Sequence, residues 1–402
     1  MCSRPGKRPE ERKVAVEAAV VVTKRRGLLT CLLLGLASIS QAAVLPADRA
    51  DVMYHSYEGG GVKIDGPAVL VRKSVTDDVS VSAQYYVDEI SGASIDVQVS
   101  ASEYYEERTQ YDIGADYLLN KTILTFGYSN STENDYEADT YSFGVSQDFF
   151  GDLSTLSLSF ALGNDTVKKS TDPEFSEDKR TQSYQFSWTQ VMTKNLLMNF
   201  IYHVITDEGY LNNPYRSFRF LTTPGDPDGG YSLATEIYPD TRTSHAFAVR
   251  GRYFMPYRAA FGFEYRRFND TWGINAYNMD LSYTHPLDQH WIIDVRYRFY
   301  SQSEADFYSD LFPVEEFQNY MGRDKEISSL SSSTLGLKVS YEIDTHWSRG
   351  WLEKAAVSFA WDMLSIEYDN FRDARRTDLP AGTEPLYKLD ADVIRFFISA
   401  WF

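Results

Sequence analysis

Apolar and polar residues alternate with a period of two along most of the chain, and the alternation is sharpest over the last nine residues. One face of this final strand carries Ile394, Phe396, Ile398, Ala400 and the terminal Phe402. The opposite face includes the polar residues Arg395 and Ser399. A strand with one apolar face predicts a strand of a membrane-spanning wall whose apolar side chains contact lipid. In hydrocarbon every backbone N–H and C=O needs a partner, so the pattern predicts a closed barrel rather than an open sheet.

The same alternation recurs from about Ala50 onward, for example over Leu156–Leu162, Trp291–Phe299 and Leu335–Tyr341. Short predicted turns alternate with longer polar loops. The predicted turns are Thr76–Asp78, Leu119–Lys121, Gly151–Asp152, Thr193–Lys194, Pro256–Tyr257, Pro286–Gln289 and Asp344–Ser348. The predicted loops are Ile90–Arg108, Ser131–Asp135, Lys168–Lys179, Asp207–Asp240, Asn269–Gly273, Ser303–Ser331 and Asn370–Glu384.

This rhythm predicts an all-β fold: a transmembrane antiparallel up-and-down β-barrel with short periplasmic turns and long extracellular loops. Counting back from the last strand gives sixteen strands, the first of them Ala50–Glu58 followed by three glycines. Fourteen strands is the alternative, because Gly66 and Pro67 weaken the second strand.

The N-terminal region has a different composition. The apolar run Gly27–Ile39 follows three basic residues and precedes small residues, which predicts a signal peptide over residues 1–42 with cleavage after Ala42. An upstream start codon chosen in error explains the excess length before Lys24. A lipoprotein cleavage at Cys31 is the weaker alternative, because Thr30 suits it poorly. Residues 43–402 are then one barrel domain.

Composition narrows the function classes. Both cysteines, Cys2 and Cys31, precede the predicted cut, so the mature chain offers no thiol for catalysis or metal binding. The net charge of −18 argues against nucleic acid, whose phosphates need a basic surface. Mean hydropathy is negative, but 15% aromatic residues fits the lipid face and interfaces of a membrane barrel.

Charged residues occupy the face opposite the predicted lipid face. The predicted inward cations are Arg72, Arg250, Arg252, Arg266, Arg296, Arg298, Lys338 and Arg395. The predicted inward acids are Asp112, Asp116, Glu264, Asp280, Asp294, Glu342 and Asp362. They indicate either a wet lumen, in which a basic ladder faces acids and sets selectivity, or a lumen filled by its own ion pairs and loops.

The longest predicted loop, Asp207–Asp240, has the length of a functional loop that narrows or covers a mouth. Its predicted constriction residues are Tyr210, Asn212, Asn213, Tyr215 and Arg216.

Other candidate chemistry is weaker. The six histidines show no metal-ligand spacing, and no Gly-Xaa-Ser-Xaa-Gly motif marks a nucleophile, so we expect no catalytic site, no metal and no cofactor. Asp226, Asp228 and Gly229 are read as a turn rather than a calcium loop. Acidic loop residues, among them Glu133 and Asp135, are either solvated or hold divalent cations that bridge lipid phosphates.

Four stretches carry a family resemblance: residues 47–75, SAQYYVDEISGASIDV, GVSQDFFGDLSTLSL and VITDEGYLNNPYRSFRF. They resemble an uncharacterised proteobacterial family known as domain of unknown function 3570. The resemblance implies an outer-membrane barrel and no assigned activity. The last strand is also similar to the closing strand of bacterial outer-membrane barrels, which implies that Phe396, Ile398 and Phe402 are read by the assembly machinery.

The sequence therefore predicts a Gram-negative outer-membrane barrel that acts as a porin-like channel for a small polar or charged solute. A closed scaffold barrel and an outer-membrane lipid or peptide hydrolase are the alternatives. Outer-membrane lipid and the barrel-assembly machinery are the expected partners, and a periplasmic or envelope partner and a homo-oligomer stay open.

Overall fold

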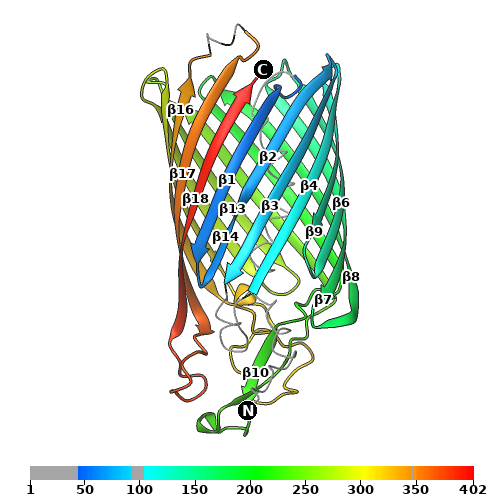
Figure 1. Ribbon diagram of the computed structural model, residues 1–402, viewed down its shortest axis with the longest axis vertical. Helices are drawn as coiled ribbons and strands as arrows, with labels where there is room; N and C mark the ends of the chain where they lie inside the picture. Colours follow the sequence, from blue (N-terminus) through cyan, green and yellow to red (C-terminus); the bar gives the residue numbers. More distant parts are fainter. Residues whose placement is uncertain (1–43, 93–103, 346–347, 349) are drawn as a thin grey trace, which may run out of the picture.

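Sixteen antiparallel strands form a closed barrel in the computed structural model, which describes residues 44–92, 104–345, 348 and 350–402 (Figure 1). The barrel strands are β1 (Arg49–Gly59), β2 (Val62–Thr76), β3 (Val79–Gly92), β4 (Tyr104–Leu119), β5 (Thr122–Thr132), β6 (Tyr136–Phe149), β7 (Ser154–Lys169), β8 (Asp172–Thr193), β9 (Leu196–Gly209), β12 (Thr241–Phe254), β13 (Ala260–Asp270), β14 (Asn275–Pro286), β15 (Trp291–Gln302), β16 (Leu330–Ile343), β17 (Lys354–Arg372) and β18 (Leu386–Trp401). The predicted fold class and the count of sixteen are confirmed. The predicted signal segment lies outside the described residues.

The first and last barrel strands, β1 and β18, close the barrel. β18 pairs with β17 on one side and with β1 on the other, where Ile398 lies opposite Val52. Every barrel strand therefore has two neighbours, and no edge is left unpaired in lipid. Among the described residues no helix combines the length and hydropathy needed to cross a bilayer.

Gly66 and Pro67 do not break β2, although they interrupt its pairing. The β2–β3 ladder runs to Asp65 opposite Glu89 and resumes at Ala68 opposite Tyr86. A Cβ on Gly66 would lie 2.0 Å from the carbonyl oxygen of Val87, so only glycine allows this close approach. The strand survives because β1 still pairs with it through His55 opposite Gly66.

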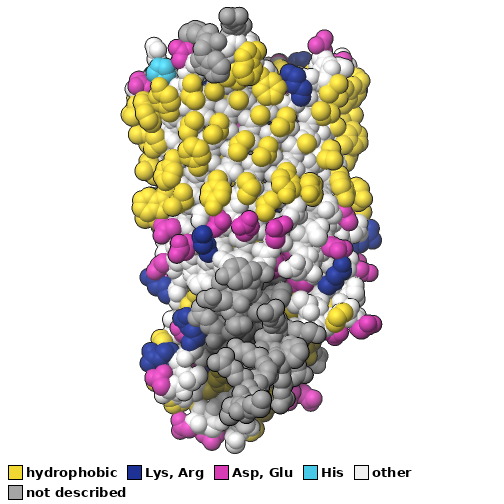
Figure 2. All heavy atoms as spheres, in the orientation of Figure 1, with side chains coloured by type: hydrophobic (Ala, Val, Ile, Leu, Met, Phe, Trp, Pro, Cys, Tyr) yellow, Lys and Arg dark blue, Asp and Glu magenta, His cyan; other side chains and the backbone are white. Residues whose placement is uncertain are grey.

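A broad apolar band covers the outer face of the barrel in the view of Figure 2. Exposed large apolar side chains also come from strands around the rest of the wall. Ile394, Phe396 and Ile398 on β18 are each 44–46% exposed, as the alternation predicted. Aromatic rings on neighbouring strands contact one another in this band, for example Tyr85 with Tyr111 at 5.0 Å between ring centroids. Acidic side chains follow directly where the band ends (Figure 2). Such a band matches the hydrocarbon core of a membrane.

The two barrel ends differ. Six of the predicted turns lie at one end, here called the turn end, together with the first residue of β1 and the last of β18, and the seventh, Asp344–Ser348, lies only in part within the described residues. At the opposite loop end several connections are shorter than predicted: residues 60–61, 133–135 and 170–171. These connections are short because the strands continue beyond the apolar band. Most of the predicted loop Lys168–Lys179, for example, belongs to the paired ends of β7 and β8.

Three long loops, residues 210–240, 303–329 and 373–385, pack together at the loop end and are called the cap. They contain the hairpin β10 (Ser217–Leu221) and β11 (Tyr231–Thr235) and the 3₁₀ turns η2 (Pro227–Gly229) and η3 (Lys325–Ile327). β10 lies beyond the barrel wall in Figure 1. Backbone bonds join the loops, including both N–H···O bonds between Ile237 and Met321 (2.9 and 2.8 Å). Phe218, Phe312 and Met321 form a buried core within the cap.

Apolar side chains also fill part of the barrel interior at the loop end. The cluster comprises Tyr57, Val62, Ile64, Ile90, Leu330, Tyr368, Phe371, Tyr387, Leu389 and Ala391. These residues come from β1 to β3 and β16 to β18, which are neighbours around the wall. One side of the loop-end interior is therefore packed, and polar space is confined to the other side.

The apolar band makes a testable distinction between neighbouring residues of β18. We expect Ile398→Arg to lower the free energy of unfolding by about 2–4 kcal/mol, the cost of a cation near the bilayer midplane. Urea unfolding of the protein folded into lipid vesicles measures it. Ser399→Arg is the matched control, because its side chain lies on the inner face; an equal loss in both variants would contradict the assigned lipid face.

Candidate functional site

A cavity of about 930 Å³ occupies the lumen, and its lining combines apolar side chains with hydroxyl and charged groups. Its lining reaches from Val44–Ala47 and Trp401 at the turn end to Glu133, Tyr136 and Lys179 at the loop end. Strands β4 to β9 and β12 to β14 provide most of the lining. The cavity therefore extends along the side of the barrel that the apolar cluster leaves free.

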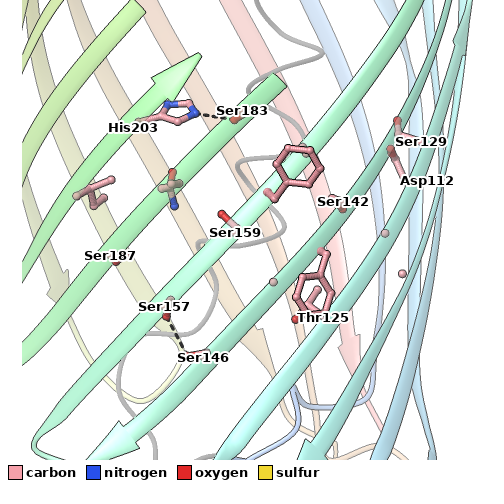
Figure 3. Close-up of a pocket in the computed structure, with 18 of the residues that line it drawn as sticks. Asp112, Thr125, Ser129, Ser142, Ser146, Ser157, Ser159, Ser183, Ser187 and His203 are labelled. Atoms are coloured by element: carbon pink, nitrogen blue, oxygen red, sulfur yellow. Dashed lines mark hydrogen bonds between the residues drawn. The ribbon is translucent and has the colours of Figure 1, made fainter. Parts of the chain in front are cut away.

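Hydroxyl groups cover one wall of this cavity. Figure 3 shows Ser129, Ser142, Ser157, Ser159 and Ser187 on adjacent strands, all facing the lumen. Ser146 and Ser157 are bonded at 2.9 Å, and the Asn199 amide donates to both Ser187 and Thr189 (2.8 and 2.7 Å). We call this surface the hydroxyl wall. The hydroxyl wall is not among the predicted lumen residues, which are all charged. Its sequence signal is that Ser, Thr and Gly occupy most of the inward positions of β5 to β8.

His203 and Ser183 lie on the hydroxyl wall, with Nε2 2.8 Å from the serine oxygen (Figure 3). A serine beside a histidine is the start of a hydrolytic site. The charge that acts on His203 comes from Arg266. A cation there opposes the imidazolium that a general base must become, so the pair is poorly suited to catalysis.

The predicted inward charges divide into two groups. Those that line the cavity are Arg72, Asp112, Asp116, Arg250, Arg252, Glu264, Arg266 and Asp280. Those outside its lining are Arg296, Arg298, Lys338, Arg395, Asp294, Glu342 and Asp362. The predicted basic ladder is thus only partly exposed to the cavity.

Several of these charges pair with neighbouring strands rather than across the lumen. Arg250 binds Glu264 at 2.5 Å, and the Nε of Arg296 donates to Asp280 at 2.6 Å. Arg395 pairs with Asp362, and Glu342 with Lys354 at 2.5 Å. Strand register explains the Arg250–Glu264 pair, because the two residues lie opposite each other in the β12–β13 ladder. Such pairs neutralise charge locally.

A buried polar chain crosses β1 to β4 near the loop end. His55 Nε2 lies 2.7 Å from Asp88, which is 3.7 Å from Arg108. Arg108 donates to Gln110 at 2.6 Å, and Gln110 donates to Asp112 at 2.9 Å. This chain of polar contacts runs from His55 on β1 to Asp112 on β4, which lines the cavity.

Three carboxylates gather beyond this chain, outside the apolar band: Glu106, Glu133 and Asp135. All three are buried, which corrects the interpretation that Glu133 and Asp135 are solvated. Burial, together with the charges of Asp135 and Glu133, raises the pKa of Glu106 to about 9.

The predicted constriction residues belong to the cap, and none of the five lines the cavity. The Tyr215 hydroxyl donates to Ser170 at 3.0 Å, which ties the loop to the β7–β8 turn. Asn212 bonds the backbone of Glu236 and Tyr238, Asn213 accepts from the Tyr215 N–H at 3.1 Å, and Tyr210 packs edge-on against Phe175. These bonds hold the five residues at the barrel rim, outside the cavity lining, and the narrowing or covering of the mouth by this loop stays a prediction.

Arg219 connects all three cap loops and is fully buried. It forms ion pairs with Glu384 and Asp310, and its Nε donates to the Asp310 carbonyl oxygen at 2.8 Å. The predicted residue Arg216 lies nearby, 4.0 Å from Asp324. Buried charges of this kind lock the loops, because separation would strand them without partners.

The closed barrel and its apolar band define an integral protein of the bacterial outer membrane. The chain belongs to the family described as "Protein of unknown function (DUF3570)", whose model matches residues 100–352, which confirms the resemblance. No curated protein matches the sequence.

The following solved structures have similar folds at low sequence identity. A bacterial polysaccharide outer membrane secretin shares 8% identity over 89% of this chain and 99% of its own, at a TM-score of 0.45. The outer membrane protein OpdK from Pseudomonas aeruginosa shares 10% identity over 88% and 99%, at 0.42. OmpT of Vibrio cholerae shares 10% identity over 90% and 100%, at 0.39. At such identities and TM-scores these likenesses carry no argument about function.

The Arg219 network predicts how the cap is held. Arg219→Leu leaves Glu384 and Asp310 without their buried cation, so we expect the cap to lose about 3–5 kcal/mol of docking stability. Hydrogen exchange and limited proteolysis of residues 303–329 report it. Arg376→Leu is the control, since its pair with Asp378 is exposed, and it should leave protection unchanged; equal deprotection by both variants contradicts the prediction.

Glu236 makes the cap sensitive to pH. Its carboxylate accepts bonds from the Arg323 N–H (2.6 Å) and the Tyr238 hydroxyl (2.7 Å). Burial, and then the Asp324 charge, raise the pKa of Glu236 to about 7 from 4.5, while Arg216 opposes the rise.

The folded cap thus holds the Glu236 proton more tightly than the unfolded chain does. We expect the contribution of Glu236 to cap stability to be complete below pH 4.5 and to fall as pH rises through about 7. Unfolding of the cap, followed at about pH 5 and about pH 8, measures this. Glu236→Gln should remove the decline, whereas the exposed Glu315→Gln in the same cap should keep it. A decline that persists unchanged in Glu236→Gln would contradict the assignment.

Proposed function

We propose that the barrel is a porin-like conduit for a small polar solute and does no catalysis. The observation that carries the proposal is the lumen cavity of about 930 Å³, whose lining reaches from the turn end to the loop end and includes the hydroxyl wall and several charged side chains. A sixteen-strand wall is wide enough to leave aqueous space inside. A barrel that served only as a scaffold has no need of a cavity of this length along one side.

The composition of the two walls favours a solute rich in hydroxyl or amide groups. Serine and threonine hydroxyls on the hydroxyl wall can both donate and accept hydrogen bonds. On the β12–β13 wall Arg250 and Glu264 neutralise each other. Arg252 is exposed and lines the cavity toward the turn end. Its positive charge would favour the passage of anions.

Planar-bilayer recordings of the refolded protein test the conduit. We expect a steady conductance above that of the protein-free bilayer. Arg252→Glu should move the reversal potential in a salt gradient toward cations, because it reverses an exposed charge in the passage. Lys194→Glu, at an exposed turn outside the cavity lining, is the control and should leave the reversal potential unchanged.

The cap gives the recordings a second arm. Deletion of the hairpin residues 217–235 should raise conductance if the cap narrows the mouth. No conductance in either the wild type or this deletion would end the conduit proposal.

A closed scaffold barrel is the second candidate. The fully buried Phe371 and the apolar cluster around it favour this reading, because they fill one side of the loop-end interior. Silent recordings from a protein that is folded and resistant to unfolding would support it. Within the described part of the chain, the hydrolase hypothesis is supported only by the His203–Ser183 pair.

A further inference from the structure

Glu106, Glu133 and Asp135 meet at the loop end of the barrel wall. Glu106 lies on the inner face of β4, and the other two flank Asn134 in the turn between β5 and β6. One carboxylate oxygen from each lies within 4.8 Å of the other two. Glu106 is 5% and Asp135 3% exposed, and the Glu133 side chain is 6% exposed. We call this group the carboxylate cluster.

The backbone fixes the turn that carries two of its members. The Glu133 N–H donates to the Tyr136 carbonyl oxygen at 2.7 Å, and the Lys168 N–H donates to the Asp135 carbonyl oxygen at 2.7 Å. These bonds hold the turn against β6 and β7. Both carboxylates therefore face Glu106 without a cost in loop ordering when a ligand arrives.

The cations described near the cluster also serve other groups. Arg108 Nε lies 3.8 Å from Glu133. The same guanidinium also contacts Asp88, Gln110 and Ser131. Lys179 is engaged with Asp165, at 3.3 Å. Arg108 is thus shared between the cluster and its neighbours.

Glu106 provides the observation that points to a ligand. Both of its oxygens are buried and have no hydrogen-bond partner within the described part of the chain. A buried carboxylate without partners is costly. The Glu106 oxygens lie close to those of Glu133 and Asp135, so the unused hydrogen-bond acceptors of Glu106 point into the cluster.

We propose that Glu106, Glu133 and Asp135 bind one divalent cation of the calcium class. Carboxylate oxygens are the ligands that hard cations prefer. Two oxygens on one Ca²⁺ at roughly 2.4 Å can lie at most about 4.8 Å apart, which the cluster satisfies. The ion ties β4 to the β5–β6 turn and neutralises the buried charge. Glu133 also lines the lumen cavity, so a path to solvent exists.

The proposal stands apart from the conduit, because it depends on charge and geometry in the wall and not on passage through the lumen. An absence of conductance leaves it untouched, and an absence of ion binding leaves the conduit untouched.

Calcium titration of the refolded full chain in detergent micelles, after treatment with EDTA, tests the site. We expect saturable binding of one Ca²⁺ with a dissociation constant on the order of 10⁻⁴ M, as in sites formed by few carboxylates. Saturating Ca²⁺ should also raise the thermal midpoint, because the ion binds only the folded wall. Mg²⁺ should bind more weakly, since it demands a tighter octahedral shell.

The variant E106Q should lose at least about tenfold in affinity. It is expected to fold without Ca²⁺, because an amide replaces a buried acid of nearly the same shape. The matched control is E107Q, which changes the next residue of the same strand on the exposed outer face. E107Q should keep the wild-type affinity.

Three results would overturn the proposal: no saturable Ca²⁺ binding in the wild type, equal affinity in E106Q, or equal loss in E106Q and E107Q. Equal affinity for Mg²⁺ and Ca²⁺ would contradict the assigned class of ion. In the first two cases the cluster holds a proton on Glu106 instead of a metal.

Discussion

Closure of the backbone hydrogen-bond ladder is the constraint on which this structure depends. Hydrocarbon offers no partner to an N–H or C=O, so β1 and β18, far apart in sequence, must pair, and they do so along the whole of β1. That pairing brings the start of β1 and the end of β18 together at one rim. All connections of the strands then alternate between the turn end and the loop end, and the outer and inner faces follow from the side-chain period.

The interior is asymmetric, and the asymmetry determines where function can lie. Inward residues of β1 to β3 and β16 to β18 form an apolar cluster near the loop end, whereas β4 to β9 present the hydroxyl wall. The cap rests over the same end, held by the buried Arg219 network. Polar space is therefore left along one side only, and the carboxylate cluster sits beside it.

Much of this plan could be predicted from local pattern. Alternation placed Ile394, Phe396 and Ile398 on the lipid face, and the spacing of turns led to sixteen strands even across Gly66 and Pro67. Inward charges such as Arg250 and Glu264 were also placed on the correct face. Local pattern did not reveal the environment of polar loop residues: Tyr215 bonds Ser170 at the barrel rim, and Glu133 is buried rather than solvated.

The sequence by itself determined which residues face lipid and how many times the chain crosses, because both follow from a two-residue period and from turn spacing, which are local. Only the tertiary structure decided which inward residues meet. Arg219 reaches Glu384 across 165 residues, and Glu106 meets Asp135 through the stagger of neighbouring strands. Such encounters depend on barrel closure and loop packing, so no window of sequence contains them.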